Sequence, residues 1–312
     1  MRRSLIVVLA MLAALLAPYQ TFAEDRAVAM SFGDSTTELW NDIIKLMRPA
    51  LKEQGFELVV DDPQFRVEQQ VQDWKAWIAQ GKVVAIMGWP INAAALTPVT
   101  RQAHDAGIPV LGYAATWPGV SAAMLTTPEA DGRDFAKYAV KWIKETYDKR
   151  NVEVAILTDE QNDLTRYRVE GIVHELKEEV PNAVVYKLPC FSREEGFNAA
   201  KQQLTAHADT RVWLSYGNEN LKGAYKALIG AGVAKNDATF FMAGMDATNE
   251  DLDLIKVPAS IYRMAFAFRS ETLAKANTAL LVAAANHMPL SDIYVRPELV
   301  TPETANNFYV GR

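Results

Sequence analysis

The chain has one cysteine, Cys190, and four histidines among 312 residues. A single cysteine excludes an internal disulfide, so the fold depends on a hydrophobic core, which a chain of this length can build. These residues show neither H-x-x-x-H nor C-x-x-C spacing, and we predict no metal site and no cofactor. Because no base lies near Cys190 in the sequence, we interpret it as a small apolar residue and not as a nucleophile.

Positive charge is also scarce. The chain has 32 Lys and Arg against 38 Asp and Glu, a formal net charge of -6. This balance argues against the basic surface that nucleic acids require. The glycine-rich patterns G-x-G-x-x-G and G-x-x-x-x-G-K-[ST] are absent as well, so no nucleotide loop is predicted.

The only long apolar run lies at the start of the chain. Arg2 and Arg3 precede apolar residues 5–17, Pro18 ends the run, and small residues follow at Thr21 and Ala23. This pattern predicts a signal peptide over residues 1–23, cleaved after Ala23. A membrane anchor needs about 20 apolar residues, and no cysteine follows the run for lipid attachment. We therefore expect an exported, soluble, acidic mature chain.

After residue 23, short apolar runs alternate with amphipathic stretches, which predicts an α/β fold with parallel-rich sheets flanked by helices. Gly55, Gly107 and Gly232 each follow a helical pattern directly before a strand, as helix C-caps do. About four strand–helix units precede Thr126 and about four follow it, so we predict two similar lobes. The expected strands are residues 27–32, 56–61, 83–88, 108–113, 152–158, 183–188, 211–216 and 239–244.

Ligands of open α/β sheets bind at the carboxyl ends of the strands. Aromatic and polar residues gather in the segments after the predicted strands, a combination that suits a sugar-like ligand. Trp89 and Trp117 are the best stacking candidates, whereas the spacing of Trp40 leaves core and pocket both open. The full set from position is Trp40, Trp89, Trp117, Arg166, Phe191, Asn218 and Asp246.

An enzymatic alternative comes from residues 32–38 (FGDSTTE), which resemble the nucleophile block of GDSL-type esterases around Ser35. Those hydrolases also need Asp-x-x-His near the C-terminus. Here Ala284 stands three residues before His287. We therefore interpret Ser35, Thr36 or Thr37 as the cap of a helix starting near Glu38, and keep an exported hydrolase as a remote alternative.

Five stretches resemble the ribose/galactose-type (type I) periplasmic binding proteins, the sugar receptors of bacterial ABC importers. They are residues 52–61 (KEQGFELVVD), 80–92 (QGKVVAIMGWPIN), 106–111 (AGIPVL), 166–171 (RYRVEG) and 243–246 (AGMD). The resemblance implies two Rossmann-like lobes joined by three crossovers. It predicts crossovers near 126–127, 263–264 and 292–294, an N-terminal lobe of residues 24–126 and 264–292, and a C-terminal lobe of 127–263 and 293–312.

The resemblance also implies ligand-binding residues. Leu39 and Trp40 match an aromatic pair that stacks on the sugar, Phe191 an aromatic of the opposite lobe, and Arg263 a hinge Gln. Trp89 replaces an Asn, and Ala114-Ala115 replace an Asp-Arg pair, which argues against a ribose-like ligand. The predicted ligand-binding set is Ser35, Leu39, Trp40, Trp89, Asn92, Trp117, Arg166, Phe191, Asn218, Asp246 and Arg263.

The resemblance implies a monomeric, non-enzymatic receptor in the periplasm that closes on a small ligand and delivers it to an ABC permease. The alternative partner is a membrane sensor, a histidine kinase or chemoreceptor. Arg166 and Arg263, both placed in the cleft by the resemblance, lead to the hypothesis that they bind an acidic sugar. The alternative is a structural role, in which Arg263 pairs with Asp246 or Glu219 and only shapes the hinge.

Overall fold

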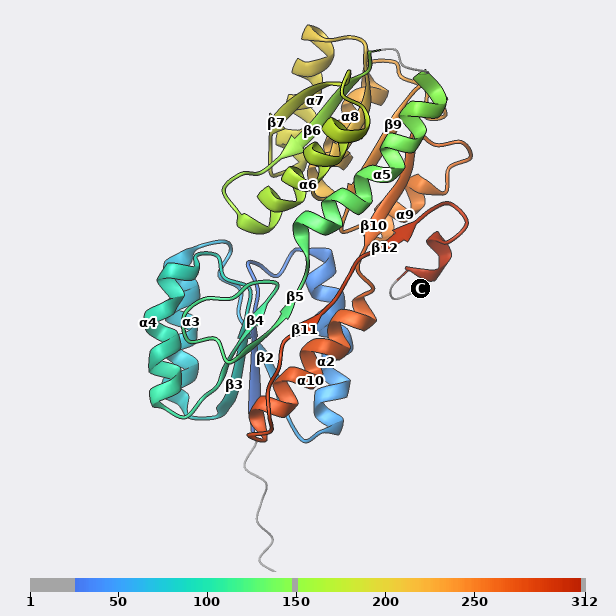
Figure 1. The fold of residues 1–312 in the computed structure, drawn as a ribbon. Helices are drawn as coiled ribbons and strands as arrows, with labels where there is room; N and C mark the ends of the chain where they lie inside the picture. The colour runs from blue at the N-terminus through green and yellow to red at the C-terminus, as the bar shows by residue number, and fades with distance from the viewer. Residues whose placement is uncertain (1–25, 148–150, 310–312) are drawn as a thin grey trace, which may run out of the picture.

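The computed structural model describes residues 26–147 and 151–309. The predicted signal peptide lies outside them. Within the described residues the chain forms two α/β lobes, each built on one six-stranded sheet (Figure 1). No helix in these residues is long and apolar enough to span a membrane.

Lobe 1 holds a sheet in which every pair of neighbouring strands is parallel, in the order β11-β5-β4-β3-β1-β2. Helices α2 and α10 cover one face, and α3 and α4 cover the other (Figure 1). The strands are β1 (Ala27–Ser31), β2 (Glu57–Val60), β3 (Val83–Gly88), β4 (Val110–Tyr113), β5 (Ala122–Leu125) and β11 (Ile293–Tyr294). The helices are α2 (Glu38–Glu53), α3 (Val67–Gln80), α4 (Ala93–Asp105) and α10 (Ser270–Ala285).

Lobe 2 repeats this plan in the order β12-β10-β9-β8-β6-β7, with only β12 antiparallel to its neighbour. Helices α5 and α6 cover one face, and α7, α8 and α9 the other. The strands are β6 (Glu153–Thr158), β7 (Val184–Pro189), β8 (Thr210–Ser215), β9 (Phe241–Met245), β10 (Tyr262–Ala267) and β12 (Glu298–Val300). The helices are α5 (Pro128–Tyr147), α6 (Asp163–Glu179), α7 (Arg193–Ala206), α8 (Glu219–Gly230), α9 (Asn249–Ile255) and the 3-10 turn η2 (Ala305–Asn307).

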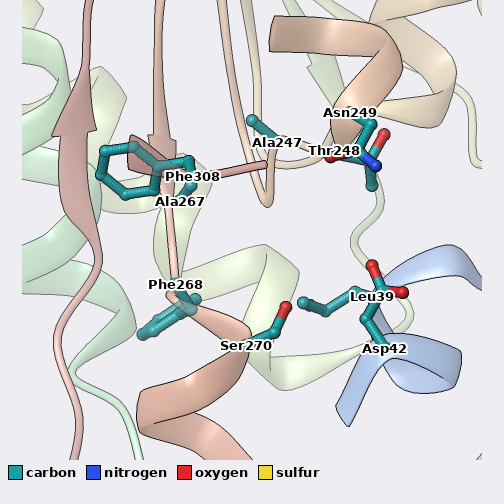
Figure 2. Close-up of a pocket in the computed structure, with 9 residues that line it drawn as sticks. All are labelled: Leu39, Asp42, Ala247, Thr248, Asn249, Ala267, Phe268, Ser270 and Phe308. Atoms are coloured by element: carbon teal, nitrogen blue, oxygen red, sulfur yellow. The ribbon is translucent and has the colours of Figure 1, made fainter. Parts of the chain in front are cut away.

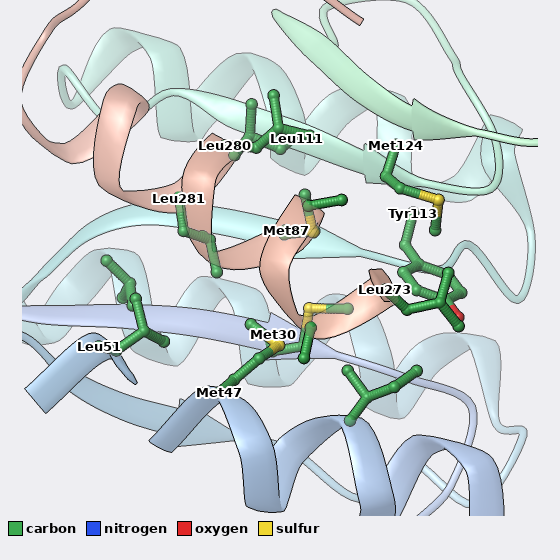
Figure 3. Packing of buried hydrophobic residues seen from close by; sticks show 14 of the residues in the cluster. Met30, Met47, Leu51, Met87, Leu111, Tyr113, Met124, Leu273, Leu280 and Leu281 are labelled. Carbon is green, nitrogen blue, oxygen red and sulfur yellow. The ribbon is translucent and has the colours of Figure 1, made fainter. Parts of the chain in front are cut away.

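The central strands are apolar on both faces because helices cover both faces of each sheet. All five residues of β1 are buried, and Met30 packs with Met47 and Leu51 of α2 (Figure 3). Leu280 and Leu281 of α10 enter the same core. Helix α10 comes directly after β10 of lobe 2 in the sequence, so part of the core of lobe 1 is formed by a segment that returns from the other lobe.

Helices α5 and α6 touch backbone to backbone through two glycines. A Cβ added to Gly132 would lie 2.1 Å from the carbonyl oxygen of Arg168, and one added to Gly171 would lie 2.1 Å from that of Glu129. Gly196 and Gly223 join α7 to α8 in the same way. No side chain larger than hydrogen fits at these contacts, so each helix pair is a close-packed unit.

The chain crosses between the lobes three times. The first crossing, at Thr126-Thr127 between β5 and α5, is where the sequence predicted it. The second falls after β10, at Phe268-Arg269, and not at 263–264, because β10 completes the sheet of lobe 2 before α10 packs on lobe 1. The third falls at 295–297 and not at 292–294, because β11 pairs with β5 of lobe 1. Residues 264–267 therefore belong to lobe 2 and residues 293–294 to lobe 1.

The eight predicted strands all form, with ends within two residues of the prediction. The three glycines expected at helix ends have positive φ angles, 82° at Gly55, 77° at Gly107 and 93° at Gly232, which confirms that interpretation. Strands β5, β10, β11 and β12 were not predicted. Strand β5 (AAML) and strand β10 (YRMAFA) contain no β-branched residue, so they lack the β-branched run from which the eight strands were predicted.

Candidate ligand-binding cleft

A cavity of about 590 Å³ lies between the lobes, where the carboxyl ends of the strands of both sheets face each other. Lobe 1 contributes the segments that follow β1 to β5, and lobe 2 those that follow β6 to β9. Phe268 and Leu273, from the second crossing and α10, complete the lining. The volume lies within the range of small-molecule sites.

Aromatic rings form the wall of the cavity on lobe 1, here called the aromatic wall: Trp40, Phe65 and Trp89. The ring centroids lie 5.5 Å apart for Trp40 and Trp89, 6.0 Å for Trp40 and Phe65, and 6.2 Å for Phe65 and Trp89. Trp40 also stacks on the buried ring of Phe32, with centroids 5.1 Å apart. Trp40 is therefore core on one face and cavity lining on the other, which answers the question its spacing left open.

Phe65 also reaches across to lobe 2. Its ring meets that of Phe191 edge to face, with centroids 5.8 Å apart. Phe65 and its neighbour Gln64 both have left-handed backbone, with φ of 54° and 53°, a conformation that bulky residues rarely adopt. Phe191 is 54% exposed. The two rings thus form an aromatic contact between the lobes at the border of the cavity.

Lobe 2 supplies the polar side of the cavity. The Arg168 guanidinium donates to both carboxylate oxygens of Asp246, at 2.5 and 3.0 Å, and to the carbonyl oxygen of Tyr216 at 2.9 Å. The Arg168 side chain is 3% exposed and that of Asp246 is 26% exposed. Burial and the nearby Asp246 charge raise the pKa of Tyr113, which lines the cavity from lobe 1, so its hydroxyl stays protonated as a donor.

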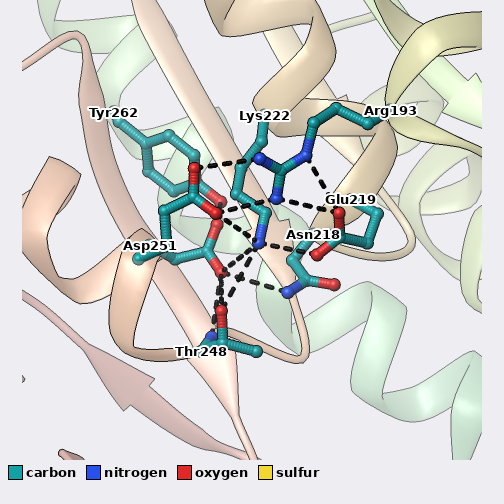
Figure 4. A network of polar contacts seen from close by, with 8 residues as sticks. Arg193, Asn218, Glu219, Lys222, Thr248, Asp251 and Tyr262 are labelled. Carbon is teal, nitrogen blue, oxygen red and sulfur yellow. Dashed lines mark hydrogen bonds and ion pairs between the residues drawn. The ribbon is translucent and has the colours of Figure 1, made fainter. Parts of the chain in front are cut away.

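A second polar network supports the rim of lobe 2 (Figure 4). Lys222 is only 2% exposed, and its ammonium lies 2.7 Å from Glu219, 3.3 Å from Glu250 and 3.7 Å from Asp251. The Arg193 guanidinium pairs with Glu219 and Glu250. Asp251, completely buried, also accepts from Tyr262 at 2.9 Å and from Asn218 at 3.1 Å. These bonds hold Asn218 and Glu219 at the cavity.

The structure brings six of the predicted ligand-binding residues together around the cavity. They are Leu39, Trp40, Trp89, Phe191, Asn218 and Asp246.

The other predicted residues do not line it. The backbone N–H of Ser35 donates to Asp62 at 3.0 Å, and the side chain is exposed. The carboxylate of Asp34 accepts from the backbone N–H of Thr37, and α2 begins at Glu38 as expected. Asn92 caps α4 by accepting from Ala95.

Trp117 is a core residue. Its ring is 6% exposed, packs near Trp74 in the core beneath α3 and α4, and donates to the Thr100 hydroxyl at 2.8 Å. A buried hydroxyl partner explains how a tryptophan in a turn can be packed inside. The interpretation of Trp117 as a stacking residue is corrected accordingly.

The two arginines placed in the cleft by the resemblance also lie outside it. Arg166 forms ion pairs with Asp163 at 2.7 Å and Glu170 at 3.0 Å along α6. Arg263 donates to the carbonyl oxygen of Phe240 at 2.7 Å, and its guanidinium lies 5.3 Å from the Trp142 ring centroid. Neither contacts Asp246 in the described residues. The hypothesis of an acidic sugar held by both arginines loses its basis.

Sequence reasoning missed Arg168, Phe65 and Tyr113. Arg168 carried a usable signal, since it precedes Ile172 and Leu176 at intervals of four on the buried face of α6, whereas Arg166 shares its face with Glu170. Phe65 lies in a loop after β2 and has no such signal.

No feature of the cavity suggests covalent chemistry. None of the four histidines lines it. Burial raises the pKa of Cys190 to about 12, so its thiol is protonated at neutral pH. In the part of the chain that the structure describes, no group of three His, Cys, Asp or Glu residues could hold a metal ion.

A second hollow, of about 10 Å³, lies between the lobes beside the second crossing. Figure 2 shows Leu39 and Asp42 of α2 facing Thr248 and Asn249 of lobe 2 across it. It offers room for about one water molecule. The large cavity is therefore the candidate ligand site.

Comparison with known proteins agrees with this geometry. The family model of the periplasmic binding protein domain matches residues 28–287. The chain belongs to the periplasmic binding protein family. Its two lobes and three crossings are the type I form of that fold. No curated protein is similar enough in sequence to count as a relative.

Several solved binding proteins share the fold at low identity. A solute-binding protein from Actinobacillus succinogenes with bound D-allose is 19% identical, with a TM-score of 0.81 over 91% of this chain and 100% of the other. One from Bacillus halodurans with bound myo-inositol is 21% identical, with a TM-score of 0.78 over 92% and 99%. The Caulobacter myo-inositol binding protein is 20% identical, with a TM-score of 0.78 over 90% and 95%.

Proposed function

We propose that the protein is a periplasmic receptor that closes on a small sugar-like ligand and delivers it to an ABC importer. The observation that carries this proposal is the composition of the cavity, where the aromatic wall of lobe 1 faces the Arg168–Asp246 pair of lobe 2. Aromatic faces bind the C–H faces of a sugar or cyclitol ring, and the charged pair binds its hydroxyls. Structural neighbours with bound allose and myo-inositol support the same ligand class.

Binding works by bridging the lobes. A ring that lies on Trp40 and Trp89 reaches Arg168 and Asp246 only when the lobes are closed, so the ligand stabilises the closed form over the open one. The three crossings provide the hinge for this rotation. No bond is made or broken, and the closed pair of lobes is the form that a permease recognises.

A thermal-shift screen of the purified protein against hexoses, pentoses, cyclitols and other polyols tests the function. A ligand at 100 times its Kd adds about 2.7 kcal/mol of stability. We expect a stabilising ligand, and a smaller radius of gyration in its presence by small-angle X-ray scattering.

Two tryptophan variants make the test specific. Trp89→Leu removes a ring that lines the cavity, whereas Trp142→Leu removes one in lobe 2 that packs against Phe241 at a tilt and lies outside the cavity. Binding should be lost in the first and retained in the second. Ligand binding without any compaction, or equal losses in both variants, would contradict the proposal.

A further inference from the structure

The positive charges that line the cavity are already neutralised by the protein itself. Arg168 is paired with Asp246, and Arg193 with Glu219 and Glu250. Lys222, just behind the lining, has three carboxylates within 4 Å. Among the described lining residues, no cation is left to balance an anionic ligand. An anion would lose its hydration without gaining a counter-charge, which is unfavourable.

The helix N-termini around the cavity do not change this result. Helices α2, α6, α7 and α8 begin at the cavity, and their partial positive charges would ordinarily favour an anion. Each first turn, however, carries its own carboxylate: Glu38, Asp163, Glu195 and Glu219 respectively. Glu195 even accepts directly from the backbone N–H of Phe191, at 2.6 Å. The chain thus compensates these dipoles itself.

One carboxylate of the lining, at the start of α2, carries more negative charge than the partial positive charge of its helix end balances. Asp34 accepts bonds from Thr36 and Thr37, whereas Glu38, half-buried, has no hydrogen bond or ion pair with any described residue. The aromatic wall lies on the same lobe. Ring faces carry partial negative charge and attract cations at about 0.5–2 kcal/mol each. A carboxylate without a partner and three aromatic rings therefore favour positive charge at this side of the cavity.

We infer that the ligand is a cation, an amine-bearing sugar or polyol whose ammonium group is bound by Glu38 and the aromatic wall while its hydroxyls reach Arg168 and Asp246. This inference rests on the proposed receptor function and adds the charge of the ligand. It replaces the acidic sugar that the sequence suggested.

The test compares ligands that share a ring and differ in charge. Isothermal titration calorimetry measures the binding of D-glucosamine, D-glucose and D-glucuronate, and of the matching galactose series. Choline and its uncharged isostere 3,3-dimethylbutanol test the aromatic wall alone. We expect the amine of at least one series to bind at least tenfold more tightly than its neutral member, and the acid to bind least.

Two variants of α2 locate the charge effect. Glu38→Gln should weaken amine binding at least tenfold and weaken the binding of neutral sugars by a smaller factor. Glu53→Gln removes the same charge from the exposed far end of the helix, about 22 Å away at 1.5 Å per residue, and should change neither.

Tighter binding of a neutral or acidic member, or equal effects of the two substitutions, would overturn the inference and leave the receptor function intact. If no amine in the panel binds, the inference is also overturned. If no sugar or polyol of any charge binds or compacts the protein, the proposed function fails with it.

Discussion

The Arg168–Asp246 pair makes a quantitative prediction about stability. Asp246→Asn keeps the shape of the side chain but leaves a guanidinium that is 3% exposed without a counter-charge. Arg168 is poorly placed to compensate, since its Nε has no partner and only the Tyr216 carbonyl remains besides Asp246. Removing one partner of a buried pair costs about 3–5 kcal/mol. Because the Asp246 side chain is 26% exposed, we expect the lower end, about 3 kcal/mol.

The double variant separates charge burial from other effects. Arg168→Met combined with Asp246→Asn removes the orphaned charge, so the double variant should be more stable than Asp246→Asn alone by about 1 kcal/mol or more. The free energies of unfolding of the wild type, both single variants and the double variant, from urea denaturation followed by circular dichroism, complete the cycle.

Helix α6 provides a matched control. Arg166 and Asp163 are 2.7 Å apart, close to the 2.5 Å of the Arg168–Asp246 pair, but they are 35% and 82% exposed. Solvent screens such a pair, so Asp163→Asn, which also removes the first-turn carboxylate of α6, should cost no more than about 1 kcal/mol. If Asp246→Asn costs no more than Asp163→Asn, or if the cycle shows no coupling, the reasoning about a buried ion pair is refuted.

Three further predictions concern other parts of the molecule. Burial raises the pKa of Asp61 to about 7, so between about pH 4 and 7 the folded state keeps a proton that the unfolded state releases. The free energy of unfolding therefore falls by at most about 4 kcal/mol as the pH rises through this window. The Tm should be lower at pH 8 than at pH 5, and Asp61→Asn should reduce this difference. Phe191→Ala removes the ring contact between the lobes and should enlarge the ligand-free protein in X-ray scattering. Tyr138→Ala, which removes another exposed aromatic ring away from the cavity, should not. Gly171→Ala should destabilise the fold by about 1–3 kcal/mol in urea denaturation, because the added Cβ meets the carbonyl oxygen of Glu129. Gly230→Ala, whose added Cβ has no atom within 4 Å, should be neutral or stabilising.

Sequence patterns predicted the parts of the fold that depend on local signals. Apolar runs located eight strands, three of them after a glycine that ends a helix, and the family resemblance placed the first crossing. Strands β11 and β12, only two and three residues long, are defined by pairing with distant strands, so the third crossing could not be placed from local pattern.

The residues of the candidate site could also be predicted only where a local pattern marks them. Trp89 and Asp246 follow strands directly, and strand ends are readable in sequence. Trp117 also follows a strand, yet it is buried because of a hydroxyl on α4, a contact that no spacing reveals. The structure places Arg168, and not Arg166, at the cavity, because Arg168 lies on the buried face of α6 and Arg166, two residues earlier, lies on the opposite face.

The glycine contact between α5 and α6 has a consequence for how specificity can change. Gly132 lies directly against the backbone of Arg168, and α5 starts immediately after the first crossing, so the polar half of the site is tied to the hinge by main-chain packing. A substitution that reshapes this half must disturb the hinge as well. Two residues of the aromatic wall, Phe65 and Trp89, carry no such constraint, because they lie in loops of lobe 1. New ligand preferences should therefore arise by changes on lobe 1, while lobe 2 keeps a fixed set of polar contacts.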